Sequence, residues 1–158
     1  LEHQTEVMNL ITKSRFETRH ALYVRNQAIA ADPASRDSAT ATAQAAIEKS
    51  AKPLVVSLLF QKEAKLAEPI SGTSSFAVDF PKRGLHDAEG QSLRDLDLQT
   101  RLFRYRCSYL IDSPAFRSLP SELQEVVHAQ LKSRLTDTGE LETWALVHQA
   151  FHGMPDSR

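Results

Sequence analysis

Residues 92–120 read SLRDLDLQTRLFRYRCSYLIDSPAFRSLP, and this stretch decides the predicted architecture. At 3.6 residues per turn, its first twenty residues place apolar side chains on two opposite faces of a helix. One face carries Leu93, Leu96, Thr100, Phe103, Cys107 and Leu110, and the other carries Leu98, Leu102, Tyr105 and Tyr109. A helix at the edge of a domain needs only one apolar face. The pattern therefore predicts a central helix over about 92–111, with other helices packed on both sides.

Turn and cap signals define the helices that follow. Ser113 before Pro114 is typical of a helix start, with serine as the N-cap and proline in the first helical position. Ser121 followed by Gln124 has the spacing of a capping box and predicts another helix. That helix would bury Leu123, Val126, Val127 and Leu131. Gly139 separates it from a last helix over 140–152.

The N-terminal half also predicts helices. Residues 2–31 repeat apolar side chains on one face, and Asp32-Pro33 ends this helix because the residue before proline is pushed out of the α region. Residues 37–50 are rich in alanine, which favours helix, but Ile47 is their only large apolar residue, so a peripheral helix is expected. Pro53 fits the first turn of a short buried helix over 54–60, for which a buried strand is the alternative.

Residues 64–91 are expected to form a long ordered loop. The segment is punctuated by Pro69, Gly72, Pro81, Gly84 and Gly90 and shows no sustained periodicity. A loop of this length in a compact domain is usually functional or disordered. Four apolar side chains predict that it is instead anchored to the core: Ile70, Phe76, Val78 and Phe80.

These elements predict an all-α fold of five or six helices packed round the 92–111 helix, as a single domain over residues 1–158. A chain of 158 residues, 41% hydrophobic and 25% charged, is ordinary for one domain with a real core. The net charge of −1 gives no overall field that would attract nucleic acid. The longest apolar run, 54–60, is too short to span a membrane. A single cysteine excludes an internal disulfide and a Cys-pair zinc site.

Residues 87–120 resemble a segment of large uncharacterised exported bacterial proteins of planctomycete and proteobacterial type, and residues 53–60 and 70–76 resemble its flanking parts. The matching positions are Gly90, Ser92, Leu93, Arg94, Arg101, Leu102, Phe103, Tyr105, Cys107, Ser108, Tyr109, Ser113, Pro114, Phe116, Leu119 and Pro120. Arg106 and Asp112 depart from the pattern, which has proline and tyrosine there. The resemblance implies no known activity. It implies a periplasmic or otherwise exported domain near the C-terminal end of a longer polypeptide.

The first residue fits that expectation, because the chain begins with Leu1 rather than methionine. We therefore expect a piece of a longer polypeptide, and a cytoplasmic location stays open.

The densest group of basic and aromatic side chains is the candidate anion- or ligand-binding site. It consists of Arg94, Arg101, Arg104, Tyr105 and Tyr109, with Arg106 beside them. Arginine can hold a carboxylate or phosphate through two parallel hydrogen bonds. The alternative is that these arginines pair with Asp95, Asp97 and Asp112, and cap carbonyl groups in the 64–91 loop. Asp97 and Arg101 have the i,i+4 spacing of such a pair.

His148 and His152 are the candidate metal ligands, since they lie one turn apart on the last predicted helix. Two ligands without a third do not make a site, and His128 or Glu140 would have to complete it. The alternative is an apolar face that closes the core or docks a partner, shared with Leu141, Trp144 and Ala145. Cys107 is interpreted as a buried small hydrophobe and not as a nucleophile.

The sequence contains no glycine-rich phosphate loop, no Ser-His-Asp motif and no CxxCH haem motif, so no cofactor is expected. The expected function is a non-enzymatic interaction or structural domain of a larger exported protein or complex. Its partner would be another protein or the remainder of the same polypeptide. The alternative is a ligand- or metal-binding domain that serves an exported redox or hydrolytic system. An independent enzyme is the third interpretation, so enzymatic activity is left undecided.

Overall fold

The computed structural model describes residues 2–61, 63 and 65–152. Over these residues the chain is predominantly helical and forms no β-strand beyond an isolated bridge, which confirms the predicted all-α fold. The helices are α1 (Glu2–Ala31), α2 (Arg36–Leu58), α3 (Phe76–Asp79), α4 (Pro114–Arg117), α5 (Ser121–Asp137) and α6 (Leu141–His152). Two short 3-10 turns accompany them, η1 (Pro33–Ser35) and η2 (Tyr109–Asp112).

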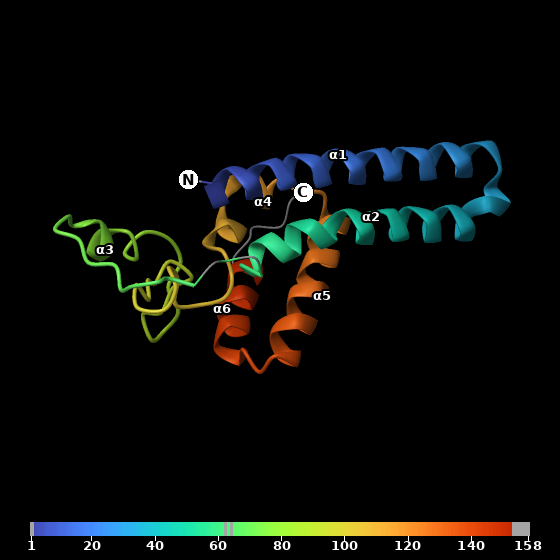
Figure 1. The fold of residues 1–158 in the computed structure, drawn as a ribbon. Helices are drawn as coiled ribbons and strands as arrows, with labels where there is room; N and C mark the ends of the chain where they lie inside the picture. The colour runs from blue at the N-terminus through green and yellow to red at the C-terminus, as the bar shows by residue number, and fades with distance from the viewer. Residues whose placement is uncertain (1, 62, 64, 153–158) are drawn as a thin grey trace.

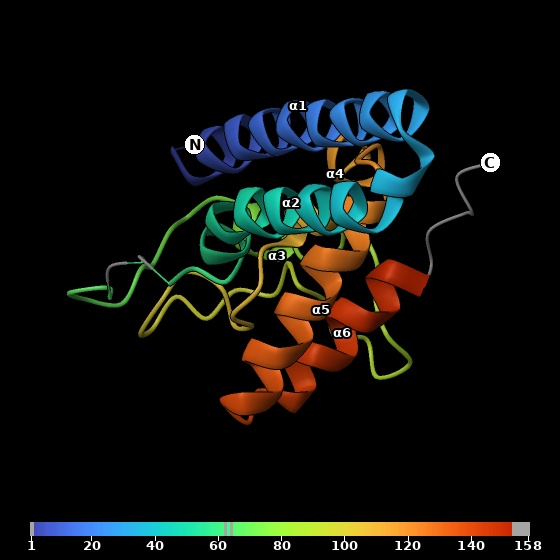
Figure 2. The same ribbon diagram turned by 90° about the vertical axis from the view of Figure 1, so that its right-hand side faces the viewer.

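Two antiparallel helical hairpins form the body of the molecule (Figures 1 and 2). The long hairpin consists of α1 and α2, and the short hairpin of α5 and α6 lies on the side of α2 that faces away from α1. The chain between α2 and η2, which contains α3, is called the irregular segment. It lies at one end of the long hairpin (Figure 1). The tip of the long hairpin, at η1, projects away from the other end.

The long hairpin closes where the sequence predicts. The Asp32 carboxylate accepts a hydrogen bond from the Ala34 backbone N–H at 3.0 Å and caps the η1 turn, with Pro33 in its first position. The two helices then pack through buried small and aliphatic side chains. Ser14 donates its hydroxyl to the Ser50 carbonyl at 3.0 Å and fixes the register of the pair. The end of the predicted helix over 2–31 is therefore confirmed.

Helix α2 is one continuous helix, so the predicted break at Pro53 and the alternative strand over 54–60 are wrong. The stretch 37–50 is also not purely peripheral, because Ile47 is fully buried. A proline inside a helix costs about 3 kcal/mol. Complete burial of Leu54, Val55 and Leu58 offsets this cost, since each such side chain stabilises the fold by roughly 1.5–3 kcal/mol.

The predicted central helix over 92–111 does not form. Residues 92–108 are irregular, and a tight turn brings Leu96 and Phe103 together as an isolated antiparallel bridge. Asp97 stabilises the turn by accepting a hydrogen bond from the Thr100 hydroxyl at 2.6 Å. Leu98 takes a left-handed conformation there, with φ of 59°. The turn replaces the helix because Phe103, Tyr105 and Cys107 alternate into the core, which only an extended chain permits.

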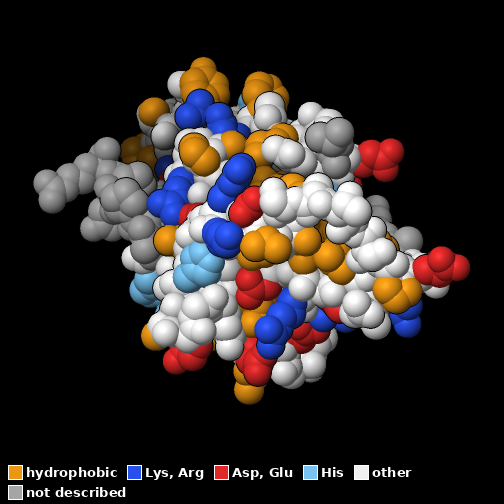
Figure 3. All heavy atoms as spheres, turned by 90° about the vertical axis from the view of Figure 1, so that its left-hand side faces the viewer, with side chains coloured by type: hydrophobic (Ala, Val, Ile, Leu, Met, Phe, Trp, Pro, Cys, Tyr) orange, Lys and Arg blue, Asp and Glu red, His pale blue; other side chains and the backbone are white. Residues whose placement is uncertain are grey.

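The irregular segment is longer than predicted and is not anchored as expected. Ile70, Phe76 and Val78 are exposed, and only Phe80 is half-buried, against Phe103 and Tyr109. A backbone hydrogen bond instead joins this part of the chain to the turn at Asp97, because the Ile70 N–H donates to the Leu98 carbonyl at 2.8 Å. Figure 3 shows the molecule from the left-hand side of Figure 1, and hydrophobic side chains lie exposed among basic ones on this face.

The cap signals of the C-terminal half are confirmed at two positions and wrong at a third. The Ser113 hydroxyl accepts a hydrogen bond from the Phe116 N–H at 3.2 Å at the start of α4, and Gly139, with φ of +74°, separates α5 from α6. The capping box is absent, because α5 starts after Pro120. The Gln124 amide instead donates to carbonyls of the preceding turn. The four residues predicted to be buried in α5 are buried.

We predict that replacing two neighbouring side chains distinguishes the observed turn from the predicted helix. Phe103 is 7% exposed and stacks on Phe60 at a centroid separation of 5.3 Å, so Phe103→Ala should cost about 3 kcal/mol of unfolding free energy. Leu102 is 40% exposed, so Leu102→Ala should cost less than about 0.5 kcal/mol. Urea unfolding followed by circular dichroism measures both values. Equal, large losses for the two variants would restore the two-faced helix.

Candidate functional site

Arg94 lies on two aromatic rings at the edge of the core. Its guanidinium carbon lies 4.2 Å from the centre of the Tyr109 ring and 5.0 Å from that of Phe80. Such stacking stabilises a cation by roughly 0.5–2 kcal/mol. Gly84 allows this approach, because a Cβ atom there would lie 2.8 Å from the Arg94 Nε atom. The small hollow beside Arg94 has a volume of about 20 Å³, enough for about one water molecule.

Arg101, Arg104 and Tyr105 lie elsewhere on the irregular segment. Arg101 donates to the Arg104 carbonyl at 2.9 Å, and the Arg104 guanidinium lies over the Tyr105 ring at 5.4 Å. The Tyr105 hydroxyl donates to the Gln91 side-chain oxygen at 2.8 Å. Burial of the Tyr105 ring raises the pKa of its hydroxyl, so it stays protonated and acts as a donor.

The structure therefore uses these arginines locally and does not bring the cluster together round one ligand. The alternative acidic pairing is also not formed as expected. Asp97 accepts its hydrogen bonds within its own turn, which lowers the pKa of its carboxyl, and Asp112 pairs with Arg117. Anion binding by this cluster stays a prediction.

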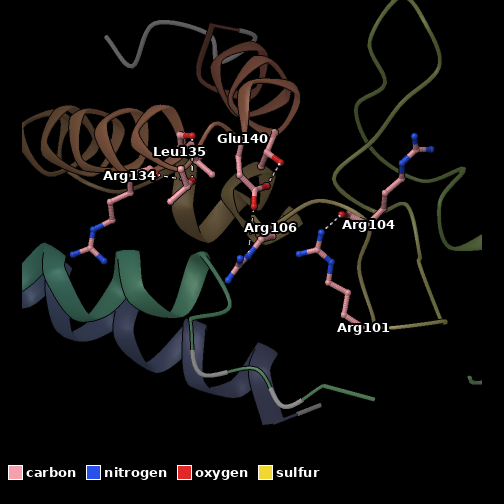
Figure 4. A network of polar contacts seen from close by, with 8 residues as sticks. Arg101, Arg104, Arg106, Arg134, Leu135 and Glu140 are labelled. Atoms are coloured by element: carbon pink, nitrogen blue, oxygen red, sulfur yellow. Dashed lines mark hydrogen bonds and ion pairs between the residues drawn. The ribbon is translucent and has the colours of Figure 1, made fainter. Parts of the chain in front are cut away.

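A polar hollow lies between the residues that follow α2, the end of α5 and the turn before α6, and it was not anticipated from the sequence (Figure 4). Its volume is about 350 Å³. Glu140 organises it. Its backbone N–H donates to the Leu135 carbonyl at 2.8 Å, and its carboxylate contacts the Arg106 Nε atom at 3.7 Å and accepts from the Thr143 hydroxyl at 3.1 Å. Arg134 donates to the Gln61 side-chain oxygen at 3.1 Å. These partners close the α5–α6 turn onto α2, so the contacts are structural.

The three histidines of the short hairpin lie close together. His148 and His152 have ring centres 3.9 Å apart on α6, and His128 of α5 lies 5.8 Å from His148 and 6.4 Å from His152. His128 packs against Trp144 and Phe151. Its Nε2 atom is buried and has no hydrogen-bond partner among the residues that the structure describes. Burial, and next the neighbouring His148 and His152, lower the pKa of His128. Of the two residues considered as a third ligand, His128 lies beside the His148–His152 pair, whereas Glu140 contacts Arg106 instead.

The described part of the chain contains no group of three or more His, Cys, Asp or Glu side chains arranged to hold a metal ion. Cys107 offers no nucleophile, because complete burial raises the pKa of its thiol to about 12. Among the described helices, none combines the length and the apolar composition needed to cross a bilayer.

A groove of about 710 Å³ lies between α1 and α2. We call it the hairpin groove, and its lining runs from Leu10 to Ala28 on α1 and from Ser35 to Pro53 on α2. Phe16 stands at this groove with 72% of its surface exposed. The sequence does not predict the groove, because the small residues of 37–50 indicate only a peripheral helix.

The outer half of the long hairpin has no core of its own. Not one residue from 19 to 42 is buried, although both helices continue through this region. Helices in proteins depend mainly on burial of an apolar face, because isolated helices are marginal in water. Val24, which also lines the groove, remains 47% exposed. The apolar contacts that such a hairpin ordinarily makes are therefore incomplete here.

Searches against protein-family models, curated proteins and solved structures gave no match to this chain.

The histidine cluster predicts a loss of stability in acid. The ordinary histidine pKa is 6.5, and that of His128 is lower in the folded protein. Below pH 6.5 the unfolded chain therefore binds more protons than the folded one, and the unfolding free energy falls as the pH decreases. His3 adds to this fall, because burial also lowers its pKa. His128→Phe should lose less stability than the parent between pH 7.5 and pH 5.5 in urea titrations. Parallel curves for the two proteins would contradict the assignment.

Metal affinity gives a separate prediction. Because the three imidazoles lack an arranged ligand set, zinc titrated into the protein and followed by calorimetry should show no site tighter than about 10 μM. A tight one-to-one site abolished by His148→Ala would reverse this conclusion. Its loss in His128→Phe as well would identify His128 as the third ligand.

Proposed function

We propose that this chain is a non-enzymatic interaction domain of a larger exported bacterial protein or complex. The observation that carries the proposal is the long hairpin, which exposes Phe16 and Val24 at an open groove and buries no residue between 19 and 42 in its outer half. Apolar side chains exposed at an open groove favour an interaction site. The resemblance of residues 87–120 to exported bacterial proteins supports the periplasmic or otherwise exported location.

The residues that could carry catalysis support an enzyme less well than the groove supports an interaction domain. The one cysteine is buried with a raised pKa, and the arginines make local contacts. The alternative, a ligand- or metal-binding domain that serves an exported redox or hydrolytic system, is supported by the histidine cluster alone. The unpartnered Nε2 atom of His128 is the specific observation in its favour, and the zinc titration tests it.

Photo-cross-linking in the native host tests the proposal. We expect a photoreactive phenylalanine analogue at position 16 to form one discrete adduct with another protein or with another part of the same polypeptide. The matched control is position 23. Tyr23 is an exposed aromatic residue of the same helix that does not line the groove. The absence of a discrete adduct, or the same adducts at both positions, would contradict an interaction through this surface.

A further inference from the structure

The length of the hairpin groove matches a helix better than a small molecule. The lining spans eighteen residue steps on each helix, from Leu10 to Ala28 and from Ser35 to Pro53. At 1.5 Å per residue, this corresponds to roughly 27 Å. A helix of about eighteen residues has this length, and it can lie along two neighbouring helices by packing its ridges into their groove.

The two walls of the groove have different chemistry. The α1 wall contributes larger apolar side chains, Leu10, Phe16 and Val24. The α2 wall is formed almost entirely by small side chains: Ser35, Ser38, Ala39, Thr42, Ala43, Ala46 and Ser50. Small residues leave room for large side chains of a facing helix. The groove therefore fits a ligand with large apolar side chains, because the α2 wall has no large apolar side chain of its own.

The charges at the groove select among such occupants. Three basic side chains line it, Lys13, Arg25 and Lys49, against one acidic side chain, Glu17. Glu17 already lies 3.9 Å from Lys13, its i,i+4 neighbour. The excess extends beyond the lining, since residues 13–53 contain seven Lys or Arg and four Asp or Glu, in a chain whose net charge is −1.

This charge excess argues against a second copy of the chain as the occupant. Two copies packed face to face would bring two positive grooves together, and like charges across an interface are repelled. A partner with acidic side chains on both flanks of an apolar stripe would be attracted to the same surface.

We propose that the hairpin groove binds an amphipathic α-helix of another protein, with large apolar residues at i, i+3, i+4 and i+7 and acidic residues on both flanks. This inference rests on the proposed interaction function and specifies the partner. The bound helix would turn the outer half of the long hairpin into a three-helix bundle. It would cover Phe16 and Val24, and its acidic flanks would lie near Arg25 and Lys49.

Two designed peptides test the proposal by fluorescence anisotropy with the whole chain. Both are eighteen-residue helices with the same leucine stripe, and one has glutamate flanks where the other has lysine flanks. We expect the glutamate peptide to bind with a dissociation constant below about 100 μM, and the lysine peptide to bind at least about tenfold more weakly. The difference should shrink in high salt, which screens exposed charges. Equal binding of the two peptides, or no binding of either, would overturn the proposal.

Variants locate the binding surface. Phe16→Ala should weaken the glutamate peptide about tenfold, and the matched control Tyr23→Ala should leave it unchanged. Arg25→Glu with Lys49→Glu should reverse the preference between the two peptides. All four side chains are largely outside the core, so each variant is expected to fold, and circular dichroism checks this. An effect of Tyr23→Ala equal to that of Phe16→Ala would place binding off the groove and overturn the proposal.

Two further measurements separate the other occupants. Analytical ultracentrifugation should find a monomer, and a dimer that Phe16→Ala dissociates would assign the groove to a second copy. Binding to anionic phospholipid vesicles that requires Phe16, without binding of the glutamate peptide, would assign it to a membrane surface. If position 16 cross-links to a protein while neither peptide binds, the interaction function stands and the acidic helix is wrong.

Discussion

The backbone hydrogen bond from the Ser108 N–H to the Leu58 carbonyl, 2.7 Å long, joins the irregular segment to the end of α2 within the core. The last carbonyl groups of a helix have no partner within it, and Leu58 ends α2 inside the core. An unpaired group there would cost about 1–3 kcal/mol. His3 contacts the Ser108 hydroxyl at 3.1 Å. Helix α1, helix α2 and the irregular segment thus meet at one residue, and Cys107, Leu110 and Ile111 are buried around it.

This junction makes the molecule asymmetric, and the asymmetry is the basis of the functional proposal. The short hairpin and the residues round Ser108 pack against the inner half of the long hairpin, so its buried residues end at Thr18 on α1 and begin at Ala43 on α2. The outer half keeps its helical form with no third layer to cover it (Figure 1). The hairpin groove includes this uncovered end and continues along the inner half as far as Leu10 and Pro53. The same two helices therefore provide one side of the core and the candidate binding surface.

The candidate sites show where reasoning from sequence alone succeeds and fails. The pairing of His148 with His152 follows from helical spacing, and the structure retains it, since α6 forms as predicted. The position of His128 beside them depends on how α5 folds back against α6, which no local pattern specifies. The arginines of the predicted cluster are separated for the opposite reason, and anion binding by them stays a prediction. The cluster was predicted on a helix that does not form, and the tight turn at Asp97 sends Arg94 and Arg101 to different surroundings.

The sequence by itself determined the helices whose ends are marked by local chemistry. Asp32-Pro33, Ser113-Pro114 and Gly139 act within a few residues of their own positions, so their effect does not depend on the rest of the fold. Tertiary structure decided two other features. Helix α2 continues through Pro53 because its last turn is buried. Residues 92–108 are irregular rather than helical because Phe103, Tyr105 and Cys107 satisfy a period of two as well as two helical stripes. The choice between these conformations depends on contacts with distant parts of the chain. Here the end of α2 provides the Leu58 carbonyl, which needs a donor, and an apolar surface.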